Sequence, residues 1–98
     1  MFKKSYIIVF DKSEIDYGQL HNIILNLHKE RVVTNWWHYI KTCYILISDR
    51  SANDLSTIIA NNLISNKKFL VAEINLNNRQ GWLSQEAWDW IKDEMARI

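Results

Sequence analysis

Apolar and polar residues follow one another with a period that changes from strand-like to helix-like and back. Residues 5–11 (SYIIVFD) are an apolar, β-branched run, which predicts a strand buried on both faces. Residues 32–39 and 43–49 are β-branched and aromatic, and because only Ile-Lys-Thr separates them, they predict a β-hairpin. Between the first strand and this hairpin, apolar residues recur at the spacing of one helix face: Leu20, Ile23, Ile24 and Leu27.

The second half of the chain continues with the same kinds of element. A helix is predicted after Ser51, which forms a capping box with Asp54, and a half-buried strand is predicted at 67–76. A third helix is predicted after Ser84, as the first is after Asp16. The apolar faces expected for these later elements are Leu55, Ile58, Ile59 and Leu63; Leu70, Ala72, Ile74 and Leu76; and Trp88, Ile91 and Met95.

The order β-α-β-β-α-β plus a C-terminal helix predicts an α+β, ferredoxin-like fold with an antiparallel sheet in the order 4-1-3-2. We expect one domain over residues 1–98, of which 76–98 form a C-terminal extension carrying the third helix. In this topology the end of the first strand, the hairpin and the start of the fourth strand meet at one edge. Asp11 is therefore expected near Lys67 and Lys68, with Asp49 at the opposite edge.

Composition narrows the class of protein. The 98 residues carry 12 Lys and Arg against 11 Asp and Glu, a formal charge of +1, which gives no argument for strong nonspecific binding to nucleic acid. A single cysteine, Cys43, excludes an intrachain disulfide and fits a reducing compartment. No apolar run reaches the length of a membrane span, so we expect a cytoplasmic protein that needs no membrane. No sequence motif for a cofactor is present.

Asp11 is the residue with the clearest potential for chemistry. A carboxylate at the end of a central strand is well held and close to the surface, and in a two-fold dimer two copies are able to share a Mg²⁺ ion. The structural alternative is a strand-end aspartate that begins a turn or forms a salt bridge with Lys12 or Lys68. His21 and His28 lie two helical turns apart, too far for one metal ion, and are expected at the boundary of the helix face.

Four consecutive ring-bearing residues precede the hairpin turn: Trp36, Trp37, His38 and Tyr39. Lysines expected at the same edge are Lys12, Lys41, Lys67 and Lys68. Cations interleaved with aromatic rings are typical of surfaces that bind single-stranded nucleic acid. Strand alternation, however, sends Trp36 and Trp37 to opposite faces, so one is expected in the core and the other on a bare face that suits a partner subunit at least as well as a base.

Four segments, SYIIVFD, WWHYIKTCYILIS, NLISNKKFLVAEI and GWLSQEAWDWI, together resemble the small bacterial proteins known as SinR-like. That group is similar to the superfamily of the CRISPR-associated endoribonuclease and of virulence-associated protein D. The resemblance implies a dimer, possible contact with RNA or DNA, and Asp11 as the metal-linked residue at the dimer interface. This chain departs from the CRISPR branch after Asp11, where KSEIDYGQL replaces a basic helix start.

These observations leave two functional hypotheses. The favoured one is a small dimeric module that binds nucleic acid, or a protein partner through its C-terminal helix, without strong catalysis and without a cofactor. The alternative is a metal-dependent endoribonuclease or toxin-like nuclease that uses Asp11 and Mg²⁺ at the dimer interface. Whether the protein is an enzyme is therefore left open by its sequence.

Overall fold

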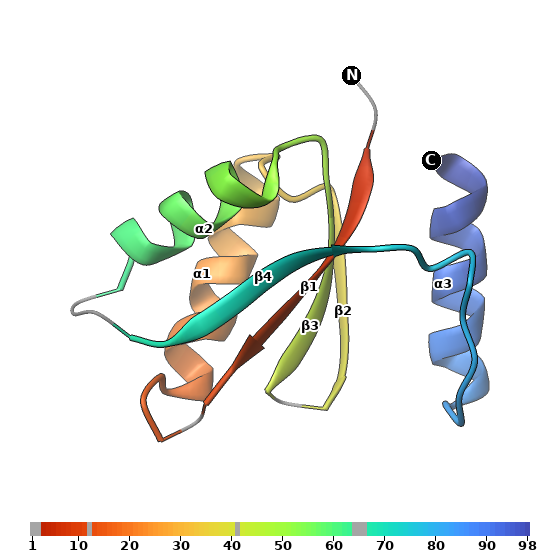
Figure 1. Ribbon diagram of the computed structural model, residues 1–98, viewed down its shortest axis with the longest axis horizontal. Coiled ribbons are helices and arrows are strands. Elements are labelled where there is room, and N and C mark those ends of the chain that lie inside the picture. Colours follow the sequence, from red (N-terminus) through yellow and green to blue (C-terminus); the bar gives the residue numbers. More distant parts are fainter. Residues whose placement is uncertain (1–2, 12, 41, 64–66) are drawn as a thin grey trace.

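A computed structural model describes residues 3–11, 13–40, 42–63 and 67–98, with residues 39–40 described by their backbone alone. Seven elements follow one another in these ranges: β1 (Lys4–Phe10), α1 (Tyr17–Lys29), β2 (Asn35–Ile40), β3 (Cys43–Ser48), α2 (Ala52–Asn61), β4 (Phe69–Ile74) and α3 (Gln85–Arg97). Figure 1 shows α1 and α2 on one side of the sheet and α3 on the other. None of the helices in these described ranges is long and apolar enough to cross a membrane.

The helix starts follow local chemistry. Asp16, Ser51 and Ser84 are the N-caps, and each side chain accepts a hydrogen bond from the backbone N–H three residues later. These bonds satisfy donors that the first helical turn leaves without partners. The three predicted caps are thereby confirmed.

The main core lies between the sheet and the two helices α1 and α2. Alternation along β1 directs Tyr6, Ile8 and Phe10 to this layer, where all three are buried. The apolar stripe of α1 and the inward residues of α2 meet them, and the fully buried members include Leu20, Ile24, Leu46, Leu55 and Ile59. On β4 the residues that pack on this core are Phe69 and Val71, whereas Leu70 is 60% exposed. The apolar face expected for that strand, with Leu70 and Ala72, thus points away from the main core.

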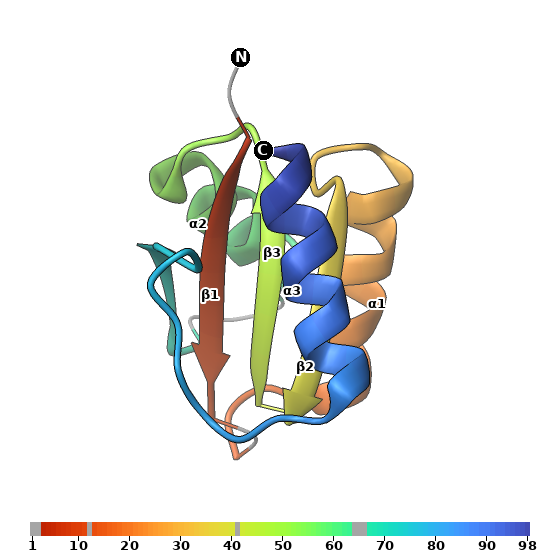
Figure 2. The same ribbon diagram turned by 90° about the vertical axis from the view of Figure 1, so that its right-hand side faces the viewer.

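The predicted fold class needs one correction. The strand order β2-β3-β1-β4 is the predicted order 4-1-3-2 counted from the other edge of the sheet. The third helix, however, is not an extension attached to a two-layer unit, because the chain runs β-α-β-β-α-β-α and α3 forms a third layer. Ala87 and Ile91 of this helix are 0% and 2% exposed. Figure 2 shows α3 lying across β2 and β3.

The buried face of α3 also differs from the predicted one. Its buried residues are Ala87, Ile91 and Glu94, while Trp88 and Met95 are only half-buried. Glu94 is accommodated because the side-chain amide of Asn35 on β2 donates a hydrogen bond to it and Arg97 lies 3.5 Å away. A buried carboxylate is tolerated where hydrogen bonds and an opposite charge replace its lost hydration.

Candidate functional site

The expected edge of the sheet exists and forms a wide depression. Antiparallel pairing of β1 sets Val9 opposite Cys43 on one side and opposite Leu70 on the other, so the residues just beyond these pairs converge. The depression has a volume of about 770 Å³ and is lined by Val9, Phe10, Asp11, Thr42, Lys68, Phe69 and Leu70. Topology alone predicted the meeting of Asp11 with Lys68 at this edge, and the structure confirms it.

Asp11 holds the turn that follows β1. Its Oδ1 accepts hydrogen bonds from the backbone N–H of Ser13 at 2.9 Å and from the Ser13 hydroxyl at 2.8 Å. Its carbonyl accepts from the N–H groups of Glu14 and Ile15, each at 3.0 Å. The turn-forming role weighed for this residue is therefore present, and its side chain stays exposed at the rim of the depression.

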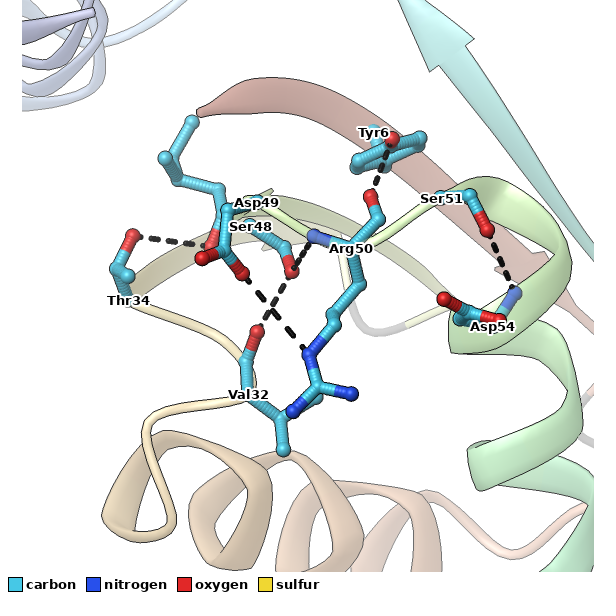
Figure 3. Close-up of polar contacts among 9 residues, drawn as sticks. Tyr6, Val32, Thr34, Ser48, Asp49, Arg50, Ser51 and Asp54 are labelled. Carbon is cyan, nitrogen blue, oxygen red and sulfur yellow. Dashed lines mark hydrogen bonds and ion pairs between the residues drawn. The ribbon is translucent and has the colours of Figure 1, made fainter. Parts of the chain in front are cut away.

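Asp49 lies at the opposite end of the sheet, as expected. Figure 3 shows this end, where the Asp49 carboxylate lies 4.0 Å from the Arg50 guanidinium. The Tyr6 hydroxyl donates to the carbonyl of Arg50 at 2.6 Å, and the Ser48 hydroxyl donates to the carbonyl of Val32 at 2.6 Å. These bonds tie the end of β3 to its neighbours, which is a structural role. Across the described residues, no group of three His, Cys, Asp or Glu side chains is arranged to hold a metal ion.

The two adjacent tryptophans lie on opposite sides of the sheet. Trp37 faces α3, and its ring centroid is 5.9 Å from that of Trp90. The face expected to be bare at this point is thus covered by the chain's own helix. The indole N–H of Trp37 is buried there and has no hydrogen-bond acceptor among the described residues. Trp36 points to the other layer and packs against the main core.

Trp36 belongs to a tight cluster of rings under α1 that the sequence analysis did not predict. Neighbouring rings in the set Tyr17, His21, Trp36, His38 and Tyr44 have centroids 4.8 to 6.4 Å apart. The signal was available in the spacing, because Tyr17 and His21 are four residues apart on a helix, and Trp36 and His38 are two apart on a strand. Each pair shares one face of its element.

Hydrogen bonds order this ring cluster. Nδ1 of His21 lies 2.6 Å from the hydroxyl of the fully buried Tyr44, and Nε2 of His38 lies 3.4 Å from the Tyr17 hydroxyl. Burial, and then the neighbouring Tyr17 hydroxyl, raises the pKa of Tyr44 well above its usual value, so Tyr44 stays protonated. His28 is separate and has Nδ1 3.1 Å from the carbonyl of Val33. Both helical histidines thus serve the fold, and burial also raises the pKa of the Cys43 thiol, which makes it a poor nucleophile.

The described residues include only part of the predicted surface of lysines and aromatic rings. Lys68 is exposed at the depression and Lys67 is half-buried, but Lys12, Lys41 and the side chain of Tyr39 lie outside the described residues. Trp36, Trp37 and His38 line a separate hollow of about 440 Å³ with Asn35 and Trp90. Among the described residues, the lining of the depression is mainly apolar and includes Val9, Phe69 and Leu70.

The protein is therefore an α+β protein with a four-stranded antiparallel sheet. Helices α1 and α2 cover one face of the sheet, and α3 covers the β2–β3 half of the other face. An apolar depression lies where β1 ends and β4 begins. Compared with protein-family models, with curated proteins and with solved structures, the chain matched none.

Proposed function

We propose that this protein is a non-catalytic binding module that associates with a second copy of itself through the uncovered half of its sheet. We call this surface the open face; it consists of Ile7, Val9, Leu70 and Ala72, on the side of β1 and β4 that α3 leaves free. The observation that carries the proposal is the cross-strand pair of Val9 and Leu70, whose side chains are 41% and 60% exposed beside the depression. Contiguous exposed apolar surface of this kind marks interaction sites.

Charge favours a second copy as the occupant. Asp11 and Lys68 have opposite signs and lie at the same rim, so a two-fold contact is able to set Asp11 of one copy beside Lys68 of the other. The formal charge of +1 leaves little electrostatic repulsion between copies. A small dimer is also what the resemblance to the superfamily of the CRISPR-associated endoribonuclease implies.

A nucleic acid suits this surface less well. Single-strand binding needs rings that bases can stack on beside a track of cations. Trp36 and Trp37 are engaged with the main core and with α3, and Lys4 pairs with Glu73 at 3.4 Å. Lys68 is therefore the cation that the described part of the depression offers to a phosphate.

The test is the solution mass of the purified protein, measured by sedimentation equilibrium from micromolar to millimolar concentration. We expect a reversible monomer–dimer equilibrium that weakens when Leu70→Asp places a charge on the open face. Leu25→Asp is the matched control, because Leu25 is also exposed, at 40%, and belongs to α1, which Figure 1 shows on the other side of the sheet from α3. A monomer at every concentration contradicts the proposal, and so does an equal effect of both variants.

The second candidate, a metal-dependent nuclease, is favoured by the exposed position of Asp11 at the rim. Its test is cleavage of RNA and DNA in Mg²⁺ or Mn²⁺ by the wild type, Asp11→Asn and the matched variant Asp49→Asn. Asparagine keeps the turn because its side-chain oxygen also accepts from Ser13. Cleavage that Asp11→Asn abolishes and Asp49→Asn retains supports the nuclease; on the main proposal, none of the three proteins cleaves.

A further inference from the structure

Trp82 stands apart from every other described tryptophan. Its side chain is 100% exposed, whereas Trp36, Trp37, Trp88 and Trp90 are all half-buried. Burial of an indole removes a large apolar area from water, and tryptophan is enriched among the residues that dominate protein interfaces. A fully exposed tryptophan on a short folded segment is therefore a candidate anchor.

The segment that carries Trp82 is held at both ends. On the β4 side, Asn78 N–H donates to the carbonyl of Asn75 at 3.2 Å, and Arg79 Nη1 donates to the carbonyl of Leu76 at 2.9 Å. On the α3 side, Ser84 caps the helix. Gly81 has a φ of +153°, which side-chain-bearing residues rarely adopt, and it sets the direction in which the chain enters Trp82. A partly fixed backbone lowers the entropy lost on docking.

The depression has the chemistry that an indole requires. Val9, Phe69 and Leu70 supply apolar walls, and its volume of about 770 Å³ falls in the range of 300 to 1,000 Å³ typical of binding pockets. Lys68 offers a cation to the ring face.

Trp82 does not fill the depression of its own chain, because its side chain is 100% exposed and is not among the described residues that line the depression. Figure 1 shows the segment between β4 and α3 running beside α3. A second copy is therefore the source of an indole for this depression, and a two-fold axis lets each copy supply one to the other.

We infer that Trp82 of each copy inserts into the depression of the other, so that every depression is completed by a residue from the second chain. This exchange rests on the proposed self-association and specifies the residue that anchors it. The contact is isologous, and it buries the exposed indole together with Val9 and Leu70.

The first experiment compares dimer dissociation constants by sedimentation equilibrium. Trp82→Ala is expected to weaken the dimer roughly thirtyfold or more, the size of an interface hot spot. Trp82→Phe retains the ring and is expected to weaken it less. Leu25→Ala, an exposed apolar control on α1, is expected to change the constant less than about twofold.

The second experiment mixes two damaged chains. Trp82→Ala retains an intact depression, and Leu70→Asp retains an intact Trp82, so their equimolar mixture contains one complete contact per heterodimer. The mixture is expected to associate more strongly than either variant alone.

The outcomes separate the two proposals. If the wild type is monomeric throughout, the self-association and the exchange both fall. If the wild type dimerises but Trp82→Ala leaves the constant unchanged, or the mixture associates no better than its components, the exchange alone is overturned.

Discussion

The two halves of the sheet contrast in how they are covered. The β2–β3 half has α1 on one face and α3 on the other, and its apolar residues are buried on both, as Ile45 and Leu46 show at 3% and 0% exposure. The β1–β4 half is covered on one face, and Val9 and Leu70 reach solvent on the other. The same alternating strand pattern thus produces core in one half and a docking surface in the other. What decides between them is the position of one helix.

The largest expected effect comes from weakening the cover of the β2–β3 half. Ile91→Ala removes apolar side-chain atoms that α3 buries against the sheet, where Ile91 is 2% exposed, and we expect the free energy of unfolding to fall by about 2–4 kcal/mol. The measurement is urea denaturation followed by circular dichroism. Lys92→Ala, at the exposed neighbour, is the control and is expected within about 0.5 kcal/mol of wild type. Equal effects from both variants contradict the three-layer arrangement.

The opposite layer of the same half is tested at Tyr44. Tyr44→Phe deletes the hydroxyl that lies 2.6 Å from Nδ1 of His21, and we expect a loss of about 1–2 kcal/mol in the free energy of unfolding. The control is Leu25→Ala, at an exposed position on α1, which is expected to change the free energy of unfolding by less than about 0.5 kcal/mol. Equal losses from the two variants contradict a stabilising role for the Tyr44 hydroxyl.

The role of Tyr44 is also expected to appear in how the free energy of unfolding changes at alkaline pH. The pKa of Tyr44 is raised in the folded protein, first by burial and then by the Tyr17 hydroxyl, so the folded chain retains a proton that the unfolded chain loses above about pH 10. This contribution to stability is complete below that pH and falls as the pH rises. Denaturation at about pH 9 and about pH 11 is expected to show a smaller decline for Tyr44→Phe than for wild type. Equal falls in the free energy of unfolding for the two proteins contradict a contribution from the Tyr44 proton.

A smaller effect is expected where α3 meets β2. The rings of Trp37 and Trp90 have centroids 5.9 Å apart, and a double-mutant cycle with leucine at each position is expected to give a coupling energy of about 0.5–1.5 kcal/mol. The same cycle between Trp37 and the fully exposed Trp82 is expected to give none. Coupling in both cycles indicates an effect of the substitutions on the unfolded chain instead.

The smallest effect belongs to the open face. In dilute protein, Leu70→Ala is expected to change the free energy of unfolding by less than about 0.5 kcal/mol, because the side chain is 60% exposed. Ile45 lies on the same side of the sheet but is 3% exposed. Ile45→Ala is therefore expected to lower the free energy of unfolding by about 2 kcal/mol or more. Similar losses at both positions mean that the two halves are covered alike.

Local chemistry made much of the fold predictable. The caps at Asp16, Ser51 and Ser84 depend on residues three positions away, and the opposite faces of Trp36 and Trp37 follow from strand geometry alone. The edge that unites Asp11 and Lys68 followed from the order of the strands. Each of these inferences needed only neighbouring residues or connectivity.

The cover provided by α3 was not predictable in this way. The buried face of α3 includes Glu94, and its burial depends on Asn35, 59 residues earlier in the sequence. On β4 both phases of the alternation contain apolar residues, and Glu73 sits in the phase of Phe69 and Val71, which made the inward face ambiguous. The depression's apolar character depends on which half of the sheet α3 covers, a tertiary choice that no local pattern records.

The opposed tryptophans also bear on how the chain reaches its native pairing. A strand β2 displaced by one residue against β3 would exchange the faces of Trp36 and Trp37, so that one tryptophan would still point to each layer. The displaced strand carries Asn35 to the far layer and leaves the Glu94 carboxylate without its amide donor. Burying a carboxylate in that state is costly. The hydrogen bond between Asn35 and Glu94 therefore favours the native register of β2 over the displaced one.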